Sequence, residues 1–466
     1  MDFDALFLSR LQFAFTIAFH IIFSSFTIGL ASYLAVLEGL WLITRREAFK
    51  TLYLFWIKVF ALSFGMGVVS GVVMSYELGA NWSVFSRMAA PVIGPLLAFE
   101  VLTAFFLESS FLGVMLFGWK KVGRGLHFVA TLLVAIGTLI SAFWIISANS
   151  WMQVPAGFAF TTSGGLIATD WLAVVFSPTF PSRLIHMVLA AYLTTALVVG
   201  GASAWRLLRV PDEAESRIGL RMAIGLLAVV APLQLIAGHV SGEMVRVHQP
   251  LKLAAIESWW RTQADQPQHL VGLPDRRAAA TGAEVSIPHL GNWVQGVSRA
   301  TVIPGLDAYP RDEWPVVWLV FWSFRIMVGL GLAMIGLGFW GLWLWRKQKL
   351  EPSSWFLRAA VAMGPMGFVS VICGWIVAEA GRQPFVIYGV LRTADAVSPV
   401  PAGSVTASLL GFMIIYAIVF SAGVLYIFRL LSEGPAGRAN DPPAMAQRAP
   451  GSALAATPDL GAGGSG

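Results

Sequence analysis

Side chains that can bind a metal ion lie inside long apolar runs of this sequence. His20, His186, Met327 and Glu379 each occupy such a run. An ionisable group in hydrocarbon costs several kcal/mol unless it is paired, coordinated or hydrated, so these positions indicate function. Haem iron takes histidine and methionine as axial ligands. His186 and Met327, if they stand on facing helices, would therefore suit a six-coordinate electron-transfer haem.

Each of these residues also has a purely structural interpretation. A lone membrane histidine commonly hydrogen-bonds between helices, and Met327 is one of fifteen methionines that can fill a core. Glu379 is followed by Arg382, which would form an ion pair at the outer rim. Arg325 precedes Met327 by two residues and lies about 200° round the helix from it. Arg325 could reach a haem propionate or simply extend to the membrane surface.

Two acids form a second pattern in the apolar run near residues 92–118. On a regular helix Glu100 and Glu108 would differ by about 80° in azimuth and about 12 Å in depth. Staggered carboxylates along a buried helix are what a proton relay needs. Ser141 and Asn149 in the next run would extend that relay, or would hydrogen-bond helices to one another.

Membrane helices must position these residues. The chain has 466 residues, of which 57% are hydrophobic and 12% charged. Soluble domains carry about 25% charged residues, so the composition predicts an all-α integral membrane protein. The start, MDFDALFLSR, lacks the basic region of a signal peptide, so we expect the first run to remain as a helix. Cys373 is the only cysteine, which excludes a disulfide framework.

Nine apolar runs reach spanning length, about 20 residues. They lie near residues 11–43, 53–79, 92–118, 126–149, 184–205, 218–241, 315–345, 356–380 and 405–430. The chain therefore divides into helices 1–6 (1–241), a polar loop (242–314), helices 7–9 (315–431) and a tail (432–466). A loop of this length without an apolar run is usually functional or disordered. The tail is rich in Pro, Ala and Gly and is predicted to be disordered.

The charges of the connecting loops predict the orientation. Basic residues follow the first, third, fifth and seventh runs: Arg45, Arg46, Lys50, Lys120, Lys121, Arg124, Arg206, Arg209, Arg217, Arg346, Lys347 and Lys349. The positive-inside rule then places the N-terminus outside, the C-terminus and tail in the cytoplasm, and the polar loop outside. The net charge of +6 reflects these loops rather than nucleic-acid binding. In this orientation the outer half of the bundle holds His20, Glu100, His186, Met327 and Glu379.

Several short motifs, in this order, resemble subunit I of the cytochrome bd quinol oxidases. They are LSRLQFA with His20 downstream, AFFLES, ANSWMQ, KLAAIES, FRIMV and GRQP, and the similarity extends to about residue 430. The resemblance implies a terminal oxidase of the bacterial inner membrane that transfers electrons from membrane quinol to O2. It implies proton uptake from the cytoplasm and proton release outside, without pumping. It also implies an obligatory second membrane subunit, with small accessory subunits in some members.

The resemblance further implies three haems: a low-spin haem b, a high-spin haem b and haem d. His186 and Met327 match the axial ligands of the low-spin haem. His20 and Glu379 match ligands of the oxygen-reducing pair, and which haem of that pair His20 binds stays open. The other positions that match cofactor-binding residues are Arg325, Trp375, which lies between haems, Arg382 and Arg10.

Four more residues match catalytic positions of the family. Glu100 matches the acid beside the haem pair, and Glu108 the acid that leads toward it from the cytoplasm. Lys252 and Glu257 of KLAAIES match residues implicated in quinol oxidation, which makes the outer loop the expected quinol-binding loop. That loop is short for the family, and Phe385 follows GRQP where many members have tryptophan. Both features resemble the cyanide-insensitive branch.

Other membrane proteins also place acids or histidines in helices. A haem-free, proton-coupled transporter would use buried acids, but it predicts broken helices in paired repeats, and no repeat is visible in the sequence. A cytochrome b of the quinol–cytochrome c type needs paired histidines along two helices, and a haem–copper oxidase needs extra histidines for copper. Only His20, His127, His186 and His239 fall in or beside the apolar runs, and no run holds such a pair.

Overall fold

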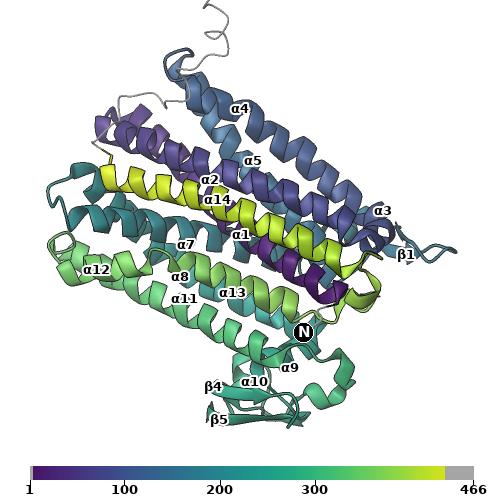
Figure 1. Cartoon of the computed structure of the whole chain (residues 1–466). Helices are drawn as coiled ribbons and strands as arrows, with labels where there is room; N and C mark the ends of the chain where they lie inside the picture. Colours follow the sequence, from purple (N-terminus) through teal and green to yellow (C-terminus); the bar gives the residue numbers. More distant parts are fainter. Residues whose placement is uncertain (1–3, 436–466) are drawn as a thin grey trace, which may run out of the picture.

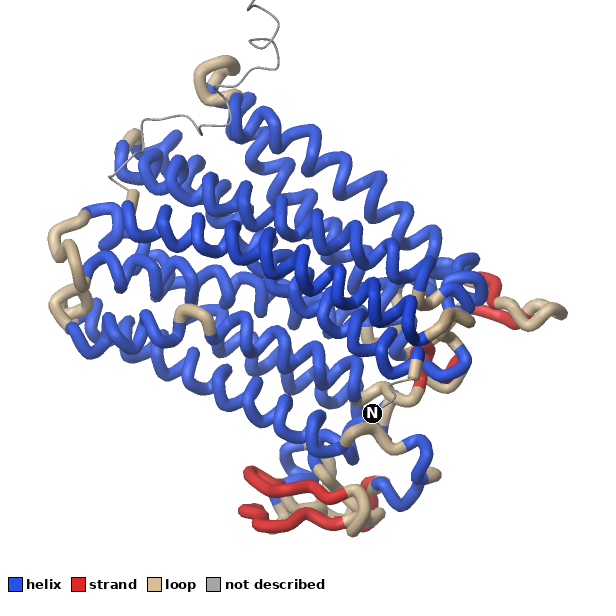
Figure 2. The backbone as a smooth tube through the Cα atoms, viewed as in Figure 1, coloured by secondary structure: helices blue, strands red, loops and turns tan. Residues whose placement is uncertain are grey.

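The computed structural model describes residues 4–435 as a bundle of long, roughly parallel helices (Figure 1, Figure 2). Nine segments in this part of the chain are long and apolar enough to cross a membrane, as the sequence predicted. They are built from α1 (Ala5–Thr44), α2 (Glu47–Ala80), α3 (Ser83–Glu100), α4 (Phe106–Phe117), α5 (Arg124–Gln153), α6 (Trp171–Val175), α7 (Phe180–Leu207), α8 (Ala214–His248), α11 (Val317–Arg346), α12 (Ser354–Met363), α13 (Met366–Ala380) and α14 (Ala402–Glu433).

Helix α1 lies at the centre and packs against α2, α5, α7, α13 and α14. Asp4 caps its first turn by accepting a hydrogen bond from the Phe7 amide at 2.7 Å. Close packing requires glycine at Gly29, because a Cβ there would stand 2.3 Å from the Thr195 hydroxyl of α7. The two helices can therefore bring their polar side chains together in the middle of the bundle.

The third spanning segment is not a regular helix. A π-helix, Val101–Phe105, joins α3 to α4 directly after Glu100. A π turn takes up one extra residue, so Glu100 and Glu108 lie about 20° apart in azimuth and not the predicted 80°. Both acids consequently face α5, where Ser141 donates to Glu100 at 2.8 Å and Gly137 contacts the Glu108 side chain.

The polar connection between α8 and α11 is folded, and we call the bundle end that carries it the loop end. It contains α9 (Pro250–Glu257), α10 (Leu290–Val294), a hairpin of β4 (Gln268–Asp275) and β5 (Ala280–Ile287), and the short pair β3 (Gln263–Ala264) and β6 (Val302–Ile303). Figure 1 shows the hairpin and α9 together beside the start of α11. Two other short hairpins are β1 (Phe158–Phe160) with β2 (Leu166–Ala168), and β7 (Phe385–Ile387) with β8 (Leu391–Arg392). Every residue of α9 from Leu251 to Glu257 is buried, so the segment packs as part of the protein core.

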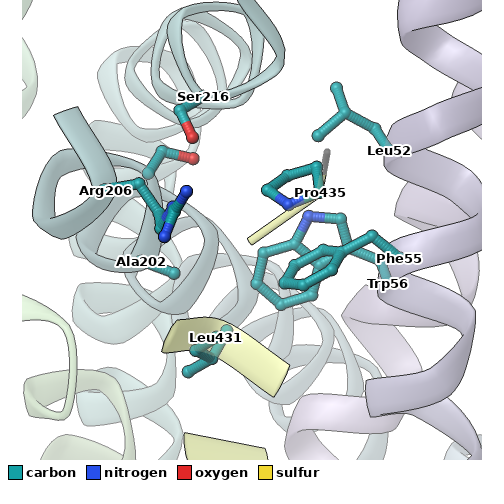
Figure 3. Close-up of a pocket in the computed structure, with 9 residues that line it drawn as sticks. Leu52, Phe55, Trp56, Ala202, Arg206, Ser216, Leu431 and Pro435 are labelled. Carbon is teal, nitrogen blue, oxygen red and sulfur yellow. The ribbon is translucent and has the colours of Figure 1, made fainter. Parts of the chain in front are cut away.

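The opposite end, where α1, α4, α7 and α11 finish, carries the basic loops, and we call it the basic end. The end of α14 is held here because Arg206 donates to the Ser432 carbonyl at 2.7 Å and pairs with Glu213. A small pocket opens beside this contact (Figure 3). It is lined by Leu52, Phe55, Trp56, Ala202, Ser203, Arg206, Ser216, Leu431 and Pro435, and therefore by none of the predicted site residues.

Two predicted boundaries move slightly. Helix α8 continues to His248, beyond the expected end at residue 241, and α14 continues to Glu433, beyond residue 431. The predicted disorder of the remaining tail, from residue 436, lies outside the described residues.

Candidate functional site

Glu379, at the end of α13, is held in a polar shell at the loop end of the bundle. Its Oε1 atom accepts hydrogen bonds from Asn149 Nδ2 at 3.0 Å and Gln153 Nε2 at 3.1 Å, both on α5. Its Oε2 atom contacts the Arg382 guanidinium, so the ion pair considered as an alternative is present. The carboxylate is therefore fixed in place by two neutral donors and one cation.

Two guanidinium groups and one amine surround this one carboxylate. Arg382 contacts it directly, Arg183 of α7 hydrogen-bonds to Asn149, and Lys252 of α9 donates to Gln153. Within residues 4–435 the Nε and Nη1 atoms of Arg382 have no hydrogen-bond partner, although its side chain is only 4% exposed. Buried guanidinium groups normally have their donors satisfied. The shell thus carries surplus positive charge that suits an anionic group.

Lys252 links this shell to the loop. Its Nζ atom donates to Gln153 Oε1 at 2.5 Å and to Gln249 Oε1 at 2.6 Å. Burial, together with the charges of Arg183 and Arg382, holds the pKa of Lys252 well below its ordinary value, although Glu379 opposes this. A lysine with a strongly lowered pKa can be neutral, and a neutral amine has a lone pair that accepts a proton.

Glu257, at the end of α9, is the other buried charged residue of that helix. It pairs with Arg325 Nη2 at 2.6 Å and accepts from Gln268 Nε2 at 2.6 Å. The same Arg325 donates to the carbonyls of Ile256 and His269. Arg325, predicted near a haem propionate, is therefore engaged by Glu257 and the loop backbone in this structure.

His20 projects from α1 toward α2. Its Nδ1 atom lies 3.1 Å from the Gly67 carbonyl and 3.2 Å from the Ser70 hydroxyl, and its Nε2 atom lies 3.3 Å from Ser24 Oγ. A Cβ at Gly71 would stand 3.2 Å from the imidazole ring. Glycine at that position therefore leaves the ring room on the α2 side.

His186 and Met327 each face a glycine in the same way. A Cβ at Gly238 of α8 would stand 3.4 Å from the His186 ring, and one at Gly374 of α13 would stand 3.0 Å from Met327 Sδ. Gln234 Nε2 lies 3.2 Å from His186 Nε2. The two candidate ligands thus stand on α7 and α11, both of which pack against α8 and α13.

Trp375 of α13 packs against a small apolar cluster that α1 and α13 share. That cluster contains Ile17 and Ile21, which lie near His20 along α1, and Met187, the neighbour of His186, packs against it as well. The structure therefore brings His20, His186 and Glu379 to one region around α13. Arg10, in contrast, is exposed near the start of α1 and makes no contact with this shell among the described hydrogen bonds.

The sequence reasoning missed the amides that connect the site. Gln153, Gln249 and Gln234 join residues that had been predicted separately, yet neutral amides give no charge signal. Only Gln153 had a usable cue, because it closes the ANSWMQ motif. Asn149 was predicted either to extend the Glu100 relay or to hydrogen-bond helices to one another, and it donates from α5 to Glu379 of α13, which matches the second alternative.

Sequence comparisons cover nearly the whole chain. Residues 8–435 match the family described as cytochrome bd terminal oxidase subunit I. Cytochrome bd ubiquinol oxidase subunit 1 of Bacillus subtilis (strain 168) is 35% identical over 448 residues, with 93% of this chain and 94% of the relative covered. Cytochrome bd-II ubiquinol oxidase subunit 1 of Escherichia coli (strain K12) is 31% identical, with 95% and 99% covered.

The fold has a solved counterpart. The bd oxidase from Geobacillus thermodenitrificans superposes with a TM-score of 0.85 at 27% sequence identity, covering 93% of this chain and 99% of the other. The likeness extends over the bundle as a whole and is not confined to a few helices.

Proposed function

This chain belongs to the subunit I family of cytochrome bd terminal oxidases, and we propose that it oxidises quinol at the loop end, holds the haems beside it and takes up protons from the basic end. As a member of that family it is a multi-pass membrane subunit of a respiratory quinol:oxygen oxidoreductase. Membership of this oxidase family excludes the alternative that the chain is a haem-free transporter.

The side chains present fit haem groups. Imidazole and thioether are ligands that haem iron accepts, and His20, His186 and Met327 each pack against a glycine at which a Cβ would crowd the side chain. The unpartnered nitrogens of Arg382, within the described chain, suit a propionate carboxylate. This cationic shell around Glu379 is the observation that carries the proposal.

In this proposal His186 and Met327 hold a low-spin haem b, and His20 and Glu379 hold the high-spin haem b and haem d. Arg382 neutralises a propionate, and Trp375 separates the two regions. Arg325 and Arg10 are weaker candidates for cofactor contact, because Arg325 is paired and Arg10 is exposed. When bound, the haems carry electrons from quinol to the place where oxygen is reduced to water.

Quinol oxidation is assigned to Lys252 and Glu257 on α9. A neutral Lys252 that donates both N–H groups to Gln153 and Gln249 keeps its lone pair free to accept a quinol proton. Glu257, oriented by Arg325, is the second polar partner for the quinol hydroxyls. Because α9 lies at the loop end, these protons leave on the side that the loop charges place outside.

Proton uptake is assigned to Glu108 and Glu100. Both face α5, and Ser141 orients Glu100. The orientation with the N-terminus outside puts Glu108 on the cytoplasmic side of Glu100. Uptake inside and release outside separate charge across the inner membrane without a pump.

The remaining family features are also proposals for this chain. A second membrane subunit, and small subunits in some relatives, would complete the enzyme. From the short loop and Phe385 we propose that the chain belongs to the cyanide-insensitive branch.

The role of Lys252 predicts a specific pH profile. Only the uncharged amine accepts a proton, so kcat/KM for quinol should fall as the pH drops below the lowered pKa of Lys252 and level off above it. Lys252→Met should lose about a hundredfold in kcat/KM and lack this acid limb. The measurement is quinol oxidase activity of the intact complex between pH 5 and 9, roughly the range in which such a base works.

Arg277→Gln, an exposed charge removed from the β4–β5 turn, is the matched control and should leave the profile unchanged. An acid limb that persists unaltered in Lys252→Met would contradict the assignment.

A further inference from the structure

A buried polar cluster lies near the basic end, away from the residues used above. His127 Nδ1 on α5 lies 2.7 Å from Glu38 Oε1 on α1, and the Thr131 hydroxyl donates to Glu38 Oε2 at 2.6 Å. The Thr131 hydroxyl has one hydrogen, which it donates to Glu38. The Tyr53 hydroxyl of α2, 3.0 Å from Thr131 Oγ1, must therefore be the donor to Thr131. All four residues are at most 2% exposed.

A structural explanation of this cluster is incomplete. Well-packed apolar residues are often as stabilising as a buried ion pair, so a stabilising role alone does not explain why polar side chains occupy this part of the core. Moreover, among residues 4–435, His127 Nε2 is buried with no hydrogen-bond partner. A buried imidazole with one nitrogen bound to a carboxylate and the other free can take a proton at the free nitrogen.

Helix α5 connects this cluster to Glu108. His127, Thr131, Thr138 and Ser141 fall within about 80° of one another around the helix, so they share one face. Gly137 on α5 contacts Glu108, whose Oε1 atom is also buried and unpartnered in the described chain. From Thr131 to Gly137 the rise is about 9 Å, too long for a direct hydrogen bond and short enough for bound water.

The cluster lies close to the surface of the basic end. His127 is in the first turn of α5, which begins at Arg124. Its ring meets Trp119 edge to face, with ring centroids 4.7 Å apart, and Trp41 packs at a tilt against Trp119, with centroids 5.2 Å apart. Lys50, Arg45 and Arg124 lie over these indoles.

We propose that Glu38 and His127 form the proton-loading site that supplies Glu108, an inference that rests on the proposed oxidase function. A proton from cytoplasmic water binds His127 Nε2, and the imidazolium passes its Nδ1 proton to Glu38. Glu38 then releases that proton through bound water to Glu108. One proton arrives and one departs at each residue, the imidazole returns to its Nδ1–H tautomer before the next proton binds, and no redox step is involved. The groups that face the pair are Tyr53 from α2, Thr131 from α5 and the cations over the indoles.

The test is quinol-driven turnover and electrogenic proton uptake by the intact oxidase complex in liposomes. Glu38→Gln keeps the side-chain length but replaces one of the two acceptor oxygens by an NH2 donor, and it cannot carry a proton. We expect uptake at least about tenfold slower. Glu38→Asp still titrates and should be faster than Glu38→Gln. A purely structural role predicts the reverse order, because glutamine keeps the side-chain length.

A second variant tests the same proposal if Glu38→Gln fails to fold. In His127→Gln, Glu38 must take protons directly from bulk water, so uptake should slow at neutral pH and recover as the pH falls. The matched control is Ser147→Ala on the opposite face of α5, which loses a buried hydrogen bond to the Val175 carbonyl and should match wild type.

Wild-type uptake in Glu38→Gln, or Glu38→Asp slower than Glu38→Gln, overturns the loading site alone. A wild-type complex that does not oxidise quinol overturns the proposed function itself, so the two failures are distinct.

Discussion

Glu108→Gln is expected to lower quinol-driven oxygen consumption about a hundredfold while the haem signals stay at wild-type intensity. Glu108 is 6% exposed and packs against Gly137, and glutamine has the same shape, so the fold should be kept. Glutamine cannot take up and release a proton, and positioned acid–base groups typically contribute 10²–10⁴-fold in rate. Oxygen consumption and the reduced-minus-oxidised spectrum, measured on one preparation, separate the two effects.

Ser109→Ala is the control for this change. Ser109 adjoins Glu108 but is exposed, and its hydroxyl donates only to the Phe106 carbonyl of its own helix. It should keep full turnover. Wild-type turnover in Glu108→Gln with intact haems would remove Glu108 from the proton path.

Met327→Leu is expected to remove the spectral signature of one low-spin haem b and to abolish most quinol oxidation. Exchange of methionine for leucine usually costs less than about 1.5 kcal/mol, so the bundle should survive. The change deletes the sulfur that faces Gly374, and with it an axial ligand in the proposal. The measurement is the reduced-minus-oxidised visible spectrum of the purified complex.

Met334→Leu provides the comparison, because Met334 is on the same helix, is 3% exposed and belongs to an apolar cluster. It should leave the spectrum unchanged. If Met327→Leu also leaves every haem band in place, Met327 is a core residue and not a ligand.

The number of spanning helices could be predicted because each span needs an apolar run of about 20 residues, and such runs can be counted in the sequence. The π-helix after Glu100 could not, since the main chain changes its hydrogen bonding there without a change in apolar pattern. The folded loop was also missed: β4 and β5 contain bulges that break the alternation from which strands are predicted.

The candidate site, too, could be predicted only in part from the sequence. Residue type and depth were enough to single out His20, His186 and Glu379. The hydrogen bonds that join Glu379 to Lys252 pass through Gln153, whose role depends on the crossing of α5, α9 and α13. Such crossings follow from tertiary packing and leave no trace in a single sequence. Arg325 was predicted to reach a haem propionate or the membrane surface, and the structure pairs it with Glu257, a partner that the sequence pattern did not indicate.

Haem extraction combined with a reduced-minus-oxidised visible spectrum of the purified complex tests the central claim most directly. We expect two b-type haems and one chlorin-type haem d, with a low-spin b signal that depends on Met327. A complex that contains no chlorin-type haem would contradict the ligand roles assigned to His20 and Glu379.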